Sequence, residues 1–134
     1  MHAINDLATL LSNMTPALNP GRFAFVTLSP GSTLDLNSVV ASIREPEGLS
    51  VVLPAQFALD QGLPVAFTAA WITLTVHSDL AAVGLTAAFS NALAQVGISC
   101  NVVAGTHHDH LFVPVEQAQM AMDALHALQQ SAAA

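Results

Sequence analysis

Residues 69–113 read AAWITLTVHSDLAAVGLTAAFSNALAQVGISCNVVAGTHHDHLFV, and this stretch decides the fold class. In its middle, apolar residues recur every three or four positions, as on one face of a helix. The stretches before and after are rich in β-branched and aromatic residues. The pattern predicts a helix at 83–96 and strands at 69–76, 99–105 and 110–113. Gly97 ends the helix, and a last helix begins after Pro114. The order strand, helix, strand, strand, helix is most of a ferredoxin-like split βαβ unit.

The first half of the chain carries a shorter version of this pattern. It predicts, in order, a helix before Pro16, a strand at 22–28, a strand at 49–53 and helical turns at 55–61. Leu49–Ala58 and Leu111–Ala118 both combine an apolar strand, a proline and a helix start that contains Gln. The first copy lacks the long helix. We therefore expect residues 1–66 to form an N-terminal helix plus an abridged unit, and residues 67–134 to form a complete one.

The composition is apolar and poor in charge. Hydrophobic residues make up 53% of the 134 residues and charged residues only 8%, whereas soluble chains have about 25% charged residues. A split βαβ sheet has helices on one face, so its other face and its edge strands need a cover, commonly a second copy of the chain. We therefore expect a homo-oligomer, in the simplest case a dimer.

The charge balance excludes two classes of partner. Arg22 and Arg44 are the only cations besides histidine, against nine carboxylates, and the net charge is −7. Nucleic acid and anionic lipid both require a basic patch, so we expect no nucleic-acid and no membrane partner. The first residues lack a signal-peptide pattern, apolar runs stop well short of the ~20 residues that cross a bilayer, and Cys100 has no second cysteine to pair with. A cytoplasmic location is expected.

Three separated segments resemble the ACT domain, and in particular the small bacterial ACT-domain proteins regarded as predicted regulators of amino-acid metabolism. They are EPEGLSVVLP at 45–54, ITLTVHSDLAAVGLTAAFSNAL at 72–93 and GISCNVVAGTHHDHLFVP at 97–114. Together with the last helix they extend the resemblance over roughly residues 22–128. The resemblance implies an α+β fold: two ACT-like units of the ferredoxin-like βαββαβ type, the first abridged and the second complete, with an antiparallel sheet and helices on one face.

The same resemblance implies a function. ACT domains bind amino acids or similar small molecules at an interface between two units, where the loop after the first strand meets the first helix. Carried onto this sequence, the ligand-binding residues are His77, Ser78, Asp79, Leu80, Ala82, Val83 and Gly84 of that loop, with Asn101 and Val102 of the strand facing the pocket. The resemblance thus implies a non-enzymatic sensor without a cofactor, whose output acts on a separate regulated protein.

The physical chemistry of this loop allows two interpretations. A helix N-terminus offers free backbone N–H groups and a partial positive charge, which suit the carboxylate of an amino acid. Ser78 or Asp79 would then contact the amino group of the ligand. Alternatively, Ser78 or Asp79 only caps the helix, and Gly84 only permits close packing.

A second candidate site is the cluster His107-His108-Asp109-His110. On a strand, His108 and His110 share a face, and two histidines two positions apart can chelate a divalent transition metal. His77 would be the third ligand if strands 69–76 and 110–113 are neighbours. The cluster therefore gives an alternative function, a metal-binding protein or metal-dependent enzyme. The other interpretation is a polar connection whose histidines bind backbone carbonyls.

No motif indicates catalysis by other means. Cys100 lies in an apolar strand, where cysteines are mostly buried and unreactive. The sequence contains no glycine-rich phosphate loop, nucleophile elbow or His-Glu-x-x-His motif. A third alternative is an oligomerisation module that binds no ligand.

Overall fold

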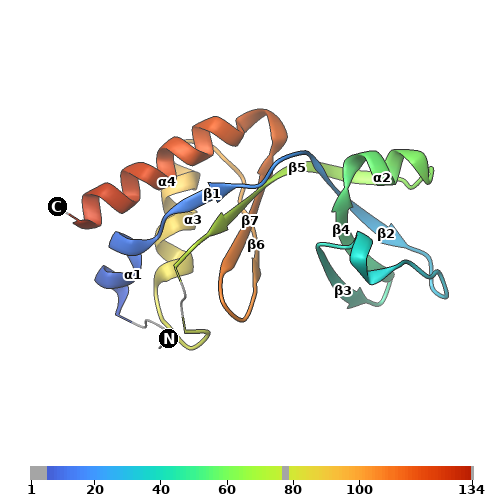
Figure 1. Ribbon diagram of the computed structural model, residues 1–134, viewed down its shortest axis with the longest axis horizontal. Coiled ribbons are helices and arrows are strands. Elements are labelled where there is room, and N and C mark those ends of the chain that lie inside the picture. Colours follow the sequence, from blue (N-terminus) through green and yellow to red (C-terminus); the bar gives the residue numbers. More distant parts are fainter. Residues whose placement is uncertain (1–5, 77–78, 134) are drawn as a thin grey trace.

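An antiparallel sheet of seven strands runs through the computed structural model, which describes residues 6–76 and 79–133 (Figure 1). The strand order is β3-β4-β2-β5-β7-β6, and β1 pairs with β5. The strands are β1 (Pro16–Leu18), β2 (Phe23–Leu28), β3 (Ala41–Glu45), β4 (Gly48–Pro54), β5 (Val65–Leu74), β6 (Asn101–Ala104) and β7 (Asp109–Pro114). The helices are α1 (Leu7–Asn13), α2 (Ala55–Asp60), α3 (Leu85–Gln95) and α4 (Ala118–Ala133), with 3-10 turns η1 (Leu36–Ser38) and η2 (Val115–Gln117).

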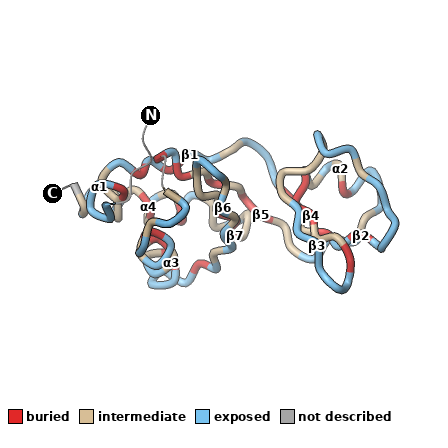
Figure 2. Tube along the Cα trace, turned by 90° about the horizontal axis from the view of Figure 1, so that it is seen from below, coloured by how far each residue is buried: buried red, intermediate tan, exposed pale blue. Residues whose placement is uncertain are grey.

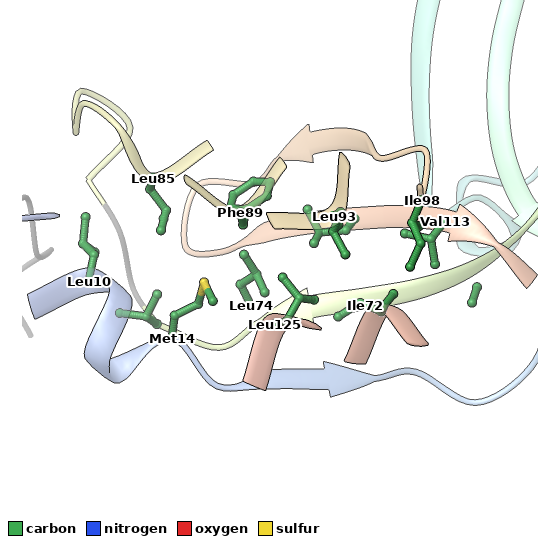
Figure 3. Packing of buried hydrophobic residues seen from close by; sticks show 14 residues of the cluster. Leu10, Met14, Ile72, Leu74, Leu85, Phe89, Leu93, Ile98, Val113 and Leu125 are labelled. Atoms are coloured by element: carbon green, nitrogen blue, oxygen red, sulfur yellow. The ribbon is translucent and has the colours of Figure 1, made fainter. Parts of the chain in front are cut away.

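The second unit has the predicted order of strand, helix, strand, strand and helix. β5 pairs with β7, β7 pairs with β6, and α3 and α4 pack against the same face of these strands. Figure 3 shows the core between the helices and the sheet. Phe89 and Leu93 of α3 and Leu125 of α4 are fully buried in it, together with Ile72 and Leu74 of β5. The apolar periodicity of residues 83–96 therefore marks the face that the structure buries.

The first unit keeps the strands and shortens the helix. β2 pairs with β4, β4 pairs with β3, and α2 packs on β2 and β4. Between β2 and β3 the chain forms only the short turn η1, so the first unit is abridged as predicted. Pro54 is the N-cap of α2 and Pro114 is the N-cap of η2. The sequence repeat around these prolines thus marks two equivalent strand-to-helix corners.

The long strand β5 belongs to both units. Its first part pairs with β2, and its part from Ala69 to Leu74 pairs with β7. Ten extended residues span about 33 Å, which is enough to serve two sheets. Figure 2 shows the two lobes on either side of β5, each with buried residues inside. β1 pairs with the end of β5, so the segment before β2 supplies a fourth strand to the second unit.

The N-terminal helix lies on the second unit, whereas the sequence-based division placed it with the first unit in residues 1–66. α1 packs against α4 and α3, and Leu10 and Met14 are fully buried in the core of the second unit. The apolar face of α1 is visible in the sequence. Its packing partner is not, because α4 lies at the other end of the chain.

The helices α2, α3 and α4 cover one face of the sheet, and aromatic side chains gather on the other. Residues directly opposite each other on neighbouring strands point to the same face. Phe25 lies opposite Phe67 on β5, and Trp71 lies opposite Phe112. Phe25 also contacts Phe112 edge-on, with ring centroids 5.4 Å apart. The predicted antiparallel sheet with helices on one face is therefore confirmed.

Candidate ligand site at the start of helix α3

The loop between β5 and α3 holds most of the predicted ligand-binding residues. His77 and Ser78 lie outside the described residues. Asp79 Oδ1 accepts a hydrogen bond from the Ala81 N–H at 2.9 Å, and the Asp79 carbonyl accepts one from the Ala82 N–H at 2.9 Å. The Asp79 carboxylate therefore stabilises a turn within the loop. It does not cap α3.

Helix α3 starts without a side-chain cap. Its N-cap is Gly84, with φ 101°, and no side chain accepts a hydrogen bond there. A Cβ atom at position 84 would lie 3.1 Å from Cδ2 of Leu7, and the positive φ strains any residue with a side chain. The first-turn N–H groups of a helix have no partner within the helix. This helix end can therefore accept a carboxylate, aided by the helix dipole.

Apolar side chains surround this helix end. Leu80 is 66% exposed and Val83 is 83% exposed, while Ala82 is half-buried. Leu7 approaches the same place from α1, as its closeness to Gly84 shows. Leu7 could not be recognised as a neighbour of this site from the sequence, because the apolar pattern of α1 shows a packing face but not what that face contacts. The loop thus combines a polar helix end with exposed apolar groups, which suits an interface between units.

The structure does not bring the two predicted strand residues to this loop. Asn101 lies opposite Phe112, and Phe112 lies opposite Trp71, so Asn101 is level with Trp71 of β5. The loop follows Val76, which is five residues beyond Trp71 and thus about 16 Å further along the chain direction, at ~3.3 Å per residue. Asn101 Nδ2 donates to the Phe112 carbonyl at 3.4 Å, and Val102 points to the opposite face of β6. The order of elements could not reveal this register.

The histidine cluster lies at the connection from β6 to β7. His108 Nδ1 is 3.2 Å from the Val76 carbonyl oxygen. A carbonyl only accepts hydrogen bonds, so this nitrogen carries a proton and donates it. This is the backbone hydrogen bond expected for a polar connection. Within the described residues, no group of three or more His, Cys, Asp or Glu side chains could hold a metal ion, and the predicted third ligand His77 lies outside them.

His110 is held in one tautomer by its neighbours. Trp71 Nε1 donates to His110 Nδ1 at 3.0 Å, and Thr73 Oγ1 lies 3.2 Å from the same nitrogen. Asn19 Nδ2 in turn donates to Thr73 Oγ1 at 2.9 Å. A tryptophan N–H can only donate, so the proton of neutral His110 is on Nε2. A metal at Nε2 would require the proton on Nδ1, facing the Trp71 N–H, and this counts against His110 as a metal ligand.

Burial shifts the protonation of several groups near β7. Burial lowers the pKa of His110 below its ordinary value, the neighbouring His108 lowers it further, and Asp109 opposes both effects. Burial also raises the pKa of Asp109, against the effect of His110. Burial raises the pKa of the Cys100 thiol to about 11. Cys100 is therefore protonated at neutral pH and is not an activated nucleophile.

Comparison with known proteins agrees with this architecture. A model of the ACT domain matches residues 2–70, and a second ACT-domain model matches residues 67–127. The chain therefore belongs to the ACT-domain family, with two ACT units in tandem, as the sequence resemblance predicted. No match was found among curated proteins. Within the described part of the chain, no helix is long and apolar enough to cross a membrane.

Several solved structures share the fold. A Vibrio cholerae protein of unknown function, VC0802, described as a possible transport protein, is 47% identical, with 92% of this chain and 96% of that chain covered and a TM-score of 0.83. Atu0741 from Agrobacterium tumefaciens is 19% identical, with 87% and 89% covered and a TM-score of 0.67. The ligand-free regulatory subunit of aspartate kinase from Thermus thermophilus is 13% identical, with 87% and 97% covered and a TM-score of 0.64. At these low identities the last two show the fold alone.

Proposed function

We propose that this protein is a non-enzymatic regulatory module of the cytoplasm that binds an amino acid at the start of α3. The observation that carries the proposal is the uncapped N-terminus of α3 at Gly84, on a loop with exposed side chains. Membership of the ACT-domain family supports it, as does the shared fold with a regulatory subunit of aspartate kinase.

The residues of the loop take separate roles in this proposal. The first-turn N–H groups of α3 bind the carboxylate of the amino acid, because a helix N-terminus favours an anion. The amino group lies toward the start of the loop, where Ser78 and Asp79 are the predicted contacts. Leu80 and Val83 extend into solvent from the single chain, and a second copy of the chain covers them together with the ligand. The proposed unit is therefore a homodimer, and its ligand acts by favouring one packing of that dimer.

The output of such a module acts on another protein. The described residues offer no activated cysteine and no metal cluster, and the family match concerns ACT domains over residues 2–127. A ligand changes the shape or assembly of the module only through its different affinity for two states. We assign the regulated partner to a separate chain.

A thermal-shift panel with each of the twenty amino acids tests this function. An amino acid present at 100 times its dissociation constant adds about 2.7 kcal/mol to the stability of the folded protein, which raises the midpoint visibly. Two variants at the exposed position 83 provide a matched pair. Val83→Asp places a carboxylate beside the helix N-terminus and should weaken binding about tenfold by repelling the ligand carboxylate. Val83→Asn has nearly the same shape as Val83→Asp but no charge, so it should bind about tenfold more tightly than Val83→Asp does.

Two outcomes would contradict the proposal. One is the absence of any shift with all twenty amino acids, which would favour an oligomerisation module without a ligand. The other is a shift of equal size in Val83→Asp and Val83→Asn, which would place the ligand elsewhere. Sedimentation velocity with and without the active amino acid then shows whether the dimer forms and whether the ligand alters it.

A further inference from the structure

A cavity lies on the helix-free face of the sheet, away from the start of α3. Its volume is about 240 Å³. Phe25 of β2 and Val52 of β4 line it from the sheet, and Ala41 and Ile43 of β3 form one side. Val103 of β6 lines the same cavity, although β6 belongs to the second unit.

The cavity exists because the sheet is strongly curled. β3 and β6 are the first and last strands in the order β3-β4-β2-β5-β7-β6. In a flat sheet these two strands would lie about 24 Å apart, at ~4.8 Å per strand. Here Ala41 of β3 and Val103 of β6 pack against the same aromatic cluster, and both line the cavity. The two edges of the sheet therefore face each other across it. Both β3 and β6 lie below β5 in Figure 1.

A smaller cavity of about 50 Å³ extends the first one toward the second unit. Ala41 and Val103 line both cavities, and Trp71 and His110 line the smaller one. A molecule in the larger cavity would thus touch both ACT units and lie next to the hydrogen bond between Trp71 and His110.

The lining selects the chemistry of the ligand. All residues that line the larger cavity are uncharged, and the hydroxyls of Thr27, Ser42 and Ser50 are the polar side-chain groups among them. A carboxylate would lose hydration there and meet no cation among the lining residues, and the Glu45 carboxylate, which accepts a hydrogen bond from Ser50 of the lining, would repel it. An amino-acid zwitterion therefore does not fit this cavity, in contrast to the start of α3.

We propose that this cavity binds a small, uncharged, apolar molecule, such as a monocyclic aromatic or a branched aliphatic compound. An apolar cavity of about 150 Å³ holds one benzene molecule, so the volume here suits about ten non-hydrogen atoms. That volume is too small for a strand or helix of another protein. This site is separate from the proposed amino-acid site and does not depend on it.

Methyl-region NMR of the full chain, titrated with toluene, tests the proposal. We expect shifts for the methyl groups of Ile43, Val52 and Val103, and none for Leu85 at the start of α3. Benzoate, which has a similar shape but carries a negative charge, should leave these methyl groups unshifted at the same concentrations. Amino acids are absent from the experiment, so its failure leaves the proposed amino-acid site untouched.

Variants that fill the cavity locate the binding. Ala41→Leu adds three carbon atoms to the β3 side and should weaken toluene binding at least about tenfold, the equivalent of ~1.4 kcal/mol. Ala104→Leu is the matched control, because Ala104 lies on the other edge strand, is exposed and points away from the cavity. Val103→Phe fills the cavity from the β6 side and provides the same test of toluene binding if Ala41→Leu does not fold.

Three results would overturn the proposal. The first is that toluene shifts none of the three methyl groups up to its solubility. The second is that neither filling variant weakens binding relative to Ala104→Leu. The third is that the same methyl groups shift with protein concentration alone, which would assign this face to contact between two copies of the chain.

Discussion

Truncation of Leu10 to alanine should destabilise the whole second unit, because this side chain anchors the N-terminal helix. Leu10 is fully buried among residues of β5, α3, β7 and α4. Leu→Ala substitutions at such sites cost about 2–5 kcal/mol, which combines the lost transfer free energy and the cavity left behind. We expect about 3 kcal/mol here, a large share of the ~5–15 kcal/mol that stabilises a typical domain.

Leu7→Ala is the matched control for this prediction. Leu7 lies on the same helix and is 38% exposed, so its truncation should cost less than about 1 kcal/mol. Urea unfolding, followed by the fluorescence of Trp71 and by circular dichroism, measures both variants. The two probes should report one transition for each protein. If Leu10→Ala lowers the free energy of unfolding no more than Leu7→Ala does, the placement of α1 on the second unit is refuted.

The remaining predictions concern single side chains near β7. Trp71→Phe keeps the ring contact with Phe112 but removes the hydrogen-bond donor to His110. The free energy of unfolding should therefore fall by about 1 kcal/mol, and the pKa of His110, measured by NMR, should rise. An unchanged pKa would contradict the tautomer assigned to His110. Since the folded state holds the pKa of His110 below its unfolded value of about 6.5, the unfolded chain takes up the proton first as the pH falls. The free energy of unfolding, measured with urea, should therefore decrease as the pH falls below about 6.5, and His110→Gln should show a smaller decrease. The same pH dependence in both proteins would argue against this role of His110. Cys100, with a pKa of about 11, should react with a disulfide reagent at neutral pH at least about tenfold more slowly than a free thiol, and rapid labelling would contradict its burial.

The second unit could be predicted from sequence because its elements are long and periodic. The apolar residues of α3 recur at helical spacing, Gly97 marks its end, and the strands β5 and β7 are rich in β-branched and aromatic residues. The corners at Pro54 and Pro114 were visible as a repeat, because proline fixes the same backbone geometry at both places.

Other features depend on contacts that the sequence does not show. β1 has only three residues, too few for a period of two to stand out, and its partner β5 lies more than forty residues further along. The placement of α1 on α4 and the curl that brings β3 toward β6 are tertiary effects of the same kind. For the candidate site, the glycine at the start of α3 could be predicted, whereas Asn101 could not be placed without the register of β6 against β7. The hydrogen bond from Trp71 to His110 was also hidden, because it joins two strands across the sheet.

The most direct test of the ligand site at the start of α3 is an amide NMR titration of the full chain with an equimolar mixture of the twenty amino acids. If a carboxylate binds at the start of α3, the backbone N–H groups of Leu85, Thr86 and Ala87 shift first and most, because these groups donate to it. The same signals should need about tenfold more ligand to shift in Val83→Asp than in Val83→Asn. Amide shifts confined to other parts of the chain, or no shifts at all, would contradict the assignment of the ligand site to this helix end.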